Sequence, residues 1–185
     1  YGMGNPDDYR TGIIRIQKGM KMAKTAFLHA LVDSLYARTE TDFARATFRV
    51  RGDTVDVNLP YADTGCRVIF WGDEIETIES IEIASGKRIE NLGMATIFPA
   101  NLYIAPKERL GDIVNDIVDE MTQQVRYFEK EGRLLEARRI AERTTFDLEM
   151  IKELGYCSGI ENYSRFFDRR PPGTRPFCLL DYFPD

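Results

Sequence analysis

The chain contains few of the side chains from which metal sites and disulfide frameworks are built. Its 185 residues include three cysteines and one histidine, His29. Cys66, Cys157 and Cys178 are far apart and form no CxxC pair, so no zinc-binding set can be recognised. We therefore expect no metal site and three reduced thiols, which favours a cytoplasmic protein.

Long apolar runs are also missing. No stretch approaches the roughly 18 apolar residues of a membrane-spanning helix, and no charged-then-apolar leader begins the sequence. We therefore expect a soluble chain without a membrane partner.

Catalytic signatures are absent as well. The phosphate-binding pattern GxxxxGK[ST] does not occur. Carboxylates are frequent, as at Asp73, Glu74, Asp147 and Glu149, but their spacing does not identify an acid–base pair. We expect no catalytic residue and no cofactor in this chain, and we predict that it is not an enzyme by itself.

Acidic side chains outnumber basic ones. The net charge is −5, and 30% of the residues are charged. This balance argues against a protein whose entire surface binds nucleic acid, although a basic strip can exist within an acidic average. Each basic cluster must therefore be judged by itself.

The first part of the chain has the pattern of an antiparallel sheet. The stretches FRVRGDTVDV at 48–57 and VIFWGDEIET at 68–77 each contain a Gly-Asp pair between alternating strands. Glycine at the first central position favours a type II′ turn. A third hairpin is expected at 84–87, and a helix over 21–35. We predict an α+β domain, built as an antiparallel β-meander with a covering helix.

The apolar period changes after Pro106. A seam at helical spacing predicts one long helix that ends at Gly132 and a second over 133–154, with Gly155 as its C′ residue. Together the two helices form an antiparallel helical hairpin. The tail that follows has no clear period and is expected to contain loops and short strands. The predicted domains are residues 1–103 and residues 104–185.

Two arginines of the first hairpin share one face of the predicted sheet. If the Gly-Asp pair forms the turn, Arg49 lies opposite Asp56 and Arg51 lies opposite Thr54. Arg51 then has no acid opposite it. Further arginines in the approaches to this sheet are Arg38, Arg45 and Arg67. The pattern allows two interpretations, a solvated charged face or an arginine cluster that binds a partner's carboxylates.

The tail mixes basic and aromatic side chains. The basic ones are Arg165, Arg169, Arg170 and Arg175, and the aromatic ones are Tyr163, Phe166, Phe167 and Phe177. Such a mixture can follow a phosphate backbone and stack bases, which makes Arg165, Arg169 and Arg170 candidate nucleic-acid contacts. Alternatively, the aromatic side chains form a core and the arginines its rim.

Longer stretches resemble one known family. DFARATFRVRGD, WGDEIE, ERTTFDLEMIKELGYCSGIENYSR and RPPGTRPFCLLDYFPD are similar to the UvrB family, the B subunits of the bacterial UvrABC excinuclease. The similarity extends over the whole chain and corresponds to the UvrA-interacting domain followed by the helical part of the first motor domain. It implies nucleotide excision repair in the bacterial cytoplasm. UvrA is the partner implied for this segment, and UvrC and damaged DNA are partners of the intact protein.

The resemblance also separates binding from catalysis. Intact members of the family are helicase-like ATPases that use ATP and Mg²⁺. Their P-loop is expected upstream of Tyr1 and their DE-box motif after Asp185. The resemblance therefore implies that this chain acts as a protein-interaction module without ATP contacts of its own.

Individual family roles can be carried over by position. Family residues that dock on UvrA correspond to Arg38, Arg49, Arg51 and Arg67. An acidic residue of the same family patch is replaced here by Ile69, which suggests apolar contact in place of an ion pair. Arg143 and Glu161 correspond to residues that anchor a DNA-clamping β-hairpin, and without that hairpin both are expected to be exposed and idle.

Two other functions are compatible with these patterns. A transcription-repair coupling factor carries a related UvrA-binding module, although CSGIENYSR and LLDYFPD favour the UvrB family. The basic-aromatic strip at 163–177 is alternatively a site for single-stranded DNA.

Overall fold

The computed structural model describes residues 3–103 and 107–183. It contains two compact units, one formed by residues 10–101 and the other by residue 102 onward together with the segment before residue 10. The sequence-based division near residue 103 assigned that first segment to the sheet domain. In the structure its described part contacts the helical unit, since Met3 N donates to Phe177 O at 2.9 Å and Tyr182 Oη donates to Gly4 O at 2.9 Å.

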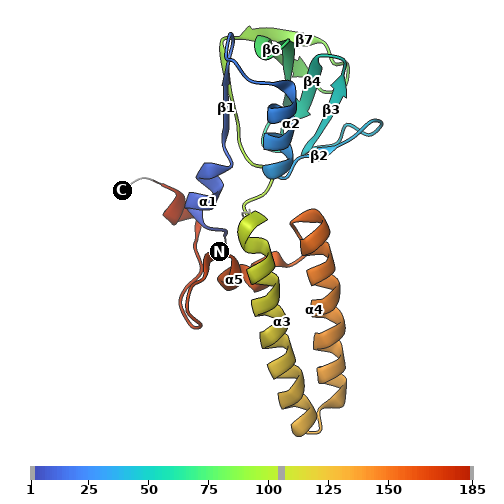
Figure 1. The fold of residues 1–185 in the computed structure, drawn as a ribbon, viewed down its shortest axis with the longest axis vertical. Helices are drawn as coiled ribbons and strands as arrows, with labels where there is room; N and C mark the ends of the chain where they lie inside the picture. Colours follow the sequence, from blue (N-terminus) through green and yellow to red (C-terminus); the bar gives the residue numbers. More distant parts are fainter. Residues whose placement is uncertain (1–2, 104–106, 184–185) are drawn as a thin grey trace. The chain divides into compact units, whose positions relative to one another are not determined.

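The first unit contains a six-stranded sheet with the strand order β2-β3-β4-β5-β6-β7 (Figure 1). Its strands are β2 Ala37–Arg38, β3 Thr47–Arg51, β4 Thr54–Asn58, β5 Thr64–Trp71, β6 Glu74–Glu82 and β7 Arg88–Leu92. Each strand from β3 to β7 pairs antiparallel with the next, while β2 lies parallel to β3. The predicted α+β meander is confirmed.

Tight turns set the register of this meander. Gly52 and Gly72 have φ angles of 59° and 58°, whereas Asp53 and Asp73 are not among the described residues with positive φ. A positive φ at the first central residue alone is the requirement of a type II′ turn. The third hairpin turns at Gly86, whose N–H donates to Glu82 O at 2.8 Å. All three predicted hairpins are therefore present.

One face of the sheet packs on the domain core. Helix α2, Lys24–Asp33, buries Phe27 and Leu31 completely against this face. Two further strands, β1 Ile14–Gln17 and β8 Met94–Ile97, form a separate antiparallel pair that adds to the same core. The sheet residues of the core include Phe48, Val55, Val57, Val68, Phe70, Ile75 and Ile78. Because side chains alternate along a strand, the polar residues between them lie on the opposite, outer face.

The second unit is built on the predicted helical hairpin. Helix α3 spans Lys107–Lys130 and helix α4 spans Leu134–Leu154. Gly155 ends α4 with a φ of 71°, in the left-handed conformation expected of a C′ glycine. The residues buried between the helices and the tail are Tyr103, Ile113, Val114, Ile117, Leu148, Ile151, Cys157, Ile160 and Phe167.

The two ends of the chain contain short helices. A helix α1 covers Pro6–Thr11, and the tail contains η1 Ile160–Tyr163, α5 Ser164–Asp168 and η2 Leu179–Tyr182. The expectation of short strands in the tail was wrong. Helices of four or five residues are too short to show a helical period of apolar residues, so no pattern in the sequence indicated them. Within the described ranges, no helix is long and apolar enough to cross a membrane.

Candidate partner-binding face

A row of charged side chains crosses the outer face of the sheet. Arg49 on β3 lies opposite Asp56 on β4, Asp56 lies opposite Arg67 on β5, and Arg67 lies opposite Glu79 on β6. Positive and negative side chains therefore alternate over four neighbouring strands. We call Arg49, Asp56, Arg67 and Glu79 the charged row.

Asp56 is the centre of the charged row. Its side chain is only 3% exposed. Its Oδ1 accepts a hydrogen bond from Arg67 Nε at 2.6 Å, and its Oδ2 accepts from Arg67 Nη2 at 3.0 Å and from Arg49 Nε at 3.0 Å. Burial by itself raises the pKa of this carboxyl, but the hydrogen bonds and charges of both arginines outweigh burial and lower its pKa. Asp56 is thus held ionised between two cations.

Two further contacts fix the arginines of the row. The guanidinium carbon of Arg49 lies 4.2 Å from the centre of the Phe43 ring, at the distance of a cation–π contact. A Cβ at Gly86 would lie 3.6 Å from Nη2 of both Arg49 and Arg67. The β6–β7 turn therefore approaches both guanidinium groups closely.

The row ends in a less buried ion pair. Glu79, whose side chain is 10% exposed, lies 3.9 Å from Arg67 Nη1 and 3.5 Å from Arg88 Nη1. The side chain of Arg88 is 58% exposed. Three guanidinium groups thus contact two buried carboxylates, and the cluster has a positive excess.

A second row on the outer face contains Arg51 and Ile69. Each of its members lies opposite the next on the neighbouring strand, from β3 to β6: Arg51, Thr54, Ile69 and Thr77. Arg51 is exposed and forms no ion pair with any residue that the structure describes. Ile69 is half-buried in the middle of this row. With threonine and isoleucine at the other three positions, Arg51 has no carboxylate in its row.

The four arginines assigned to UvrA docking therefore lie in different surroundings. Arg49 and Arg67 meet at Asp56, and Arg51 lies on the same face. Arg38 lies on the edge strand β2 and pairs with Glu40 at 3.0 Å, with both side chains more than half exposed. Such exposed pairs contribute little to stability. Of the neighbouring arginines, Arg45 pairs with the exposed Asp63 at 3.0 Å and does not join the charged row.

Sequence reasoning paired Asp56 with Arg49 but missed its second partner, Arg67. The two-residue turn fixes how β3 pairs with β4, whereas residues 59–63 leave the register of β5 open. Phe43 and Gly86 gave no signal at all, because their contacts with the row depend on how two loops fold. The alternating side chains of β5 were the only available hint that Arg67 lies on the outer face.

Arg143 in the helical unit is not idle, contrary to expectation. Its side chain is 61% exposed, yet Nε donates to Asp147 Oδ2 at 2.9 Å and Nη2 donates to Ser158 O at 3.0 Å. The buried Asp147 also accepts a hydrogen bond from Tyr163 Oη at 2.8 Å. Glu161 is exposed, and its carboxylate forms no hydrogen bond or ion pair within residues 3–103 and 107–183. Anchoring of a hairpin by Arg143 and Glu161 stays a prediction.

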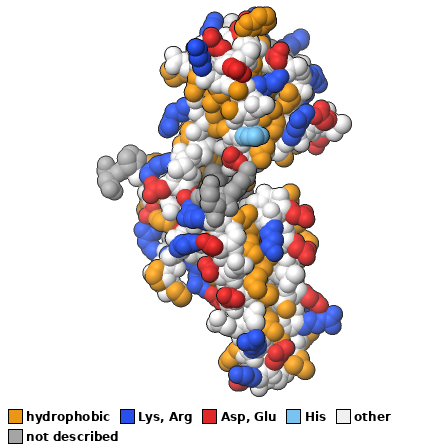
Figure 2. All heavy atoms as spheres, in the orientation of Figure 1, with side chains coloured by type: hydrophobic (Ala, Val, Ile, Leu, Met, Phe, Trp, Pro, Cys, Tyr) orange, Lys and Arg blue, Asp and Glu red, His pale blue; other side chains and the backbone are white. Residues whose placement is uncertain are grey.

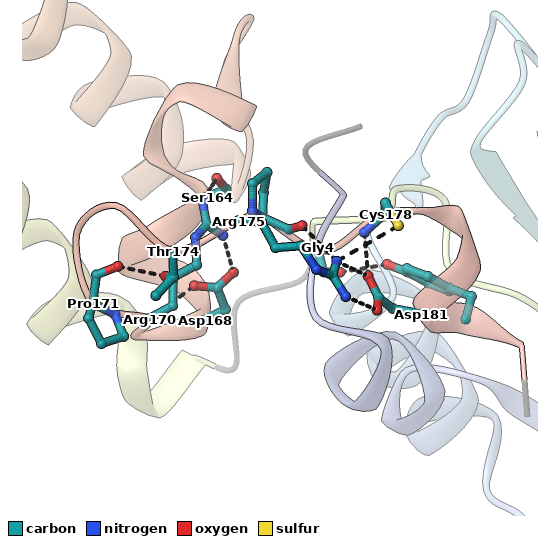
Figure 3. A network of polar contacts seen from close by, with 11 residues as sticks. Gly4, Ser164, Asp168, Arg170, Pro171, Thr174, Arg175, Cys178 and Asp181 are labelled. Carbon is teal, nitrogen blue, oxygen red and sulfur yellow. Dashed lines mark hydrogen bonds and ion pairs between the residues drawn. The ribbon is translucent and has the colours of Figure 1, made fainter. Parts of the chain in front are cut away.

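The tail arginines are paired with acids of the helical unit. Arg165 contacts Glu120, and Arg169 lies 3.1 Å from Asp112. Arg170 binds Asp168 and donates to Ser164 Oγ at 2.8 Å, as Figure 3 shows. In the same view Arg175 binds Asp181 through two hydrogen bonds of 2.8 Å.

Three of the four tail aromatics belong to the core of the helical unit or pack against it. Phe167 is buried, and Tyr163 and Phe166 pack against the same core. Phe166 also borders an open pocket of about 350 Å³ that Asp116, Arg165, Arg169 and Arg170 complete. Core packing accounts for Tyr163, Phe166 and Phe167. Nucleic-acid contact by Arg165, Arg169 and Arg170 stays a prediction.

Figure 2 shows basic and acidic side chains interspersed over the face in view. In the part of the chain that the structure describes, no group of three or more His, Cys, Asp or Glu could bind a metal ion.

Two protein-family models match the chain in succession. A model described as the UvrB interaction domain matches residues 14–103, and one described as the UvrB third helical domain matches residues 108–169. The first match includes the charged row and Arg51, and the second includes α3 from its second residue, all of α4 and α5.

Whole-chain relatives agree with these matches. Proteins named UvrABC system protein B are 54% identical in Cytophaga hutchinsonii, 52% in Bacteroides fragilis and 44% in Micrococcus luteus. Each similarity covers 100% of this chain but only 28%, 27% and 26% of the relative. The chain thus spans between a quarter and a third of their length. With two successive UvrB domains and such identity along all 185 residues, the chain belongs to the UvrB family.

Proposed function

We propose that this chain is the UvrA-binding part of a UvrB subunit that acts in bacterial nucleotide excision repair. The observation that carries the proposal is the outer face of the sheet, where Arg49, Arg51 and Arg67 lie together within the region that matches the UvrB interaction domain. A face with surplus guanidinium groups fits a partner surface that carries carboxylates.

The physical role of the face is to attract and orient an acidic surface of UvrA. Arg51 is exposed and without an acid in its row, so it is available to a partner. Charges at the rim of an interface act mainly on the association rate and the salt dependence, whereas buried and hydrogen-bonded charges act on dissociation. Arg51 belongs to the first class, and Arg49 and Arg67 belong to the second.

Catalysis belongs to the rest of the whole protein in this proposal. The sequence contains no P-loop pattern and no DE-box, so we assign ATP and Mg²⁺ binding to other segments. UvrC and damaged DNA are likewise proposed as partners of the whole protein, in the bacterial cytoplasm. The relatives named above favour the excision subunit over the transcription-repair coupling factor.

Titration calorimetry of the chain with purified UvrA at two salt concentrations tests the proposal. We expect binding that weakens with salt and falls at least tenfold in Arg51→Glu. Arg138→Glu is the matched control, because Arg138 is an exposed α4 residue with 77% of its side chain accessible. Equal loss in both variants, or no binding by the wild-type chain, would contradict the proposal.

A second candidate function is binding of single-stranded DNA at the helical unit. The pocket bordered by Arg165, Arg169, Arg170 and Phe166 favours it, although Asp116 in the same pocket opposes a phosphate. Fluorescence anisotropy with a labelled oligonucleotide separates the two functions. DNA binding at this pocket falls in Arg169→Ala and survives Arg51→Glu, whereas equal anisotropy for wild type and Arg169→Ala contradicts it.

A further inference from the structure

Asp56 lies where it can set the positions of two guanidinium groups at once. It is almost fully buried, whereas the side chains of Arg49 and Arg67 are 18% and 21% exposed, so both side chains reach the surface. We propose that Asp56 is a positioning residue, which orients Arg49 and Arg67 so that together they bind one carboxylate of an acidic partner. This inference rests on the proposed function and specifies how its site recognises the partner.

The hydrogen bonds to Asp56 leave donors for a ligand. Each guanidinium carries several N–H groups in a planar fork. Arg49 uses its Nε, and Arg67 uses its Nε and Nη2, in the three hydrogen bonds to Asp56, and Arg49 Nη2 also lies 3.0 Å from Asp56 Oδ2. Most N–H groups of the pair are therefore unused by Asp56. Together with Arg88, three guanidinium groups face the two carboxylates of Asp56 and Glu79, and this surplus of one positive charge favours a further carboxylate from outside.

The arginine pair is ordered before a partner arrives. Asp56 fixes one edge of each guanidinium, and the ring of Phe43 covers the plane of Arg49. Nη2 of both arginines lies at the same 3.6 Å distance from the Cβ position of Gly86, so the two groups converge on one turn. Order in the free protein reduces the loss of side-chain freedom on binding. Removal of Asp56 should therefore weaken binding even though it removes no contact with the partner.

A pair of charge-matched variants separates positioning from general attraction. Asp56→Asn and Glu90→Gln each remove one negative charge, and Glu90 is exposed on β7. General attraction to an acidic partner predicts that both variants bind UvrA more tightly than the wild-type chain. Positioning predicts different changes in the affinity for UvrA: Glu90→Gln should bind as tightly as the wild-type chain or slightly more tightly, and Asp56→Asn about tenfold more weakly.

The experiment is calorimetric titration of purified UvrA with the wild-type chain, Asp56→Asn and Glu90→Gln, each shown to be folded by circular dichroism. Asp56→Asn that binds as tightly as Glu90→Gln would overturn the inference. Absence of binding by the wild-type chain would instead overturn the proposed function, so the two failures are distinguishable.

A second variant keeps the test decisive if Asp56→Asn does not fold. Phe43→Leu leaves Asp56 and the strands intact, because Phe43 lies in the loop between β2 and β3. It removes the ring above Arg49, so we expect binding about threefold weaker at an unchanged Tm. Unchanged affinity in Phe43→Leu would contradict the role of a preordered arginine pair.

Discussion

Asp56 Oδ1 lies 2.6 Å from Arg67 Nε, although the two residues are 11 positions apart in the chain and on different strands. The contact places a buried carboxylate directly between two hairpins of the sheet. It links the stability of the sheet to the geometry of the face that we propose binds UvrA.

Acid should weaken the sheet unit through Asp56. The arginines lower the pKa of this carboxyl below its ordinary value of 3.8 against the effect of burial. A lowered pKa in the folded state means that the ion pairs stabilise the fold fully above the ordinary pKa, and that this stabilisation is lost as pH falls through the folded-state pKa. At neutral pH, Asp56→Asn should lower the free energy of unfolding by about 2 kcal/mol.

Urea unfolding from neutral to strongly acidic pH checks this prediction. The difference between the wild-type chain and Asp56→Asn should shrink as the pH falls below 3.8. A difference that is independent of pH would show that the charge of Asp56 does not stabilise the fold.

Ile69 should contribute apolar contact to the UvrA interface. It is half-buried on the outer face between Thr54 and Thr77. Ile69→Ala removes that contact, so we expect affinity for UvrA to fall about threefold, which is the range of a peripheral interface residue. Calorimetry at high salt is the best measurement, because salt screens the arginines and leaves apolar contact. Unchanged affinity there would place Ile69 outside the interface.

Two glycines of the helical unit should respond to alanine with opposite signs. Gly155 has a φ of 71°, a conformation that strains any other residue, so Gly155→Ala should cost about 1 kcal/mol. Gly111 lies inside α3 with open space at its Cβ position, so Gly111→Ala should stabilise by about 0.5–1 kcal/mol. Thermal unfolding followed by circular dichroism measures both, and shifts of the same sign would contradict the assigned helix positions.

Tyr163 should make the stability of the helical unit fall at alkaline pH. Burial, followed by its hydrogen bond to Asp147, raises the pKa of Tyr163 to about 12. A raised pKa in the folded state means that stabilisation is full below the ordinary value of 10.0 and is lost as pH rises toward about 12. Tyr163→Phe should lower the free energy of unfolding by about 1–3 kcal/mol at neutral pH and reduce this alkaline loss.

A matched tyrosine controls for the loss of a hydroxyl group. Tyr127 is 53% exposed on α3, so Tyr127→Phe should change the free energy of unfolding little. Chemical unfolding of both variants at neutral and alkaline pH makes the comparison. Similar effects of the two substitutions would remove the special role of the contact between Tyr163 and Asp147.

Local chemistry made much of the fold predictable. Gly52 and Gly72 indicated the positions of their turns. A two-residue turn at Gly52 is enough to predict that Arg49 lies opposite Asp56. Gly155 likewise predicted the end of α4. These features depend on neighbours within a few positions, and the sequence therefore predicted them correctly.

Contacts between distant segments were out of reach. The pairing of β1 with β8 joins residues about 80 positions apart, as at Ile14 and Ile97, and no local pattern encodes such a register. The contacts of Asp56 with Arg67 and of Phe43 with Arg49 are shorter in sequence, but they depend on how the intervening loops fold. In the tail, the alternation of arginine and aromatic residues had two interpretations, and the packing of Tyr163, Phe166 and Phe167 identified these three aromatics as part of the core.

Arginine-specific labelling with phenylglyoxal, read by mass spectrometry, tests most directly whether the outer face binds UvrA. In the free chain we expect Arg51, Arg88 and the α4 residue Arg138 to react, because all three are exposed. Saturating UvrA should protect Arg51 and Arg88 and leave Arg138 reactive. Protection of Arg138 with continued labelling of Arg51 and Arg88 would contradict the account, because it would place the interface on the helical unit.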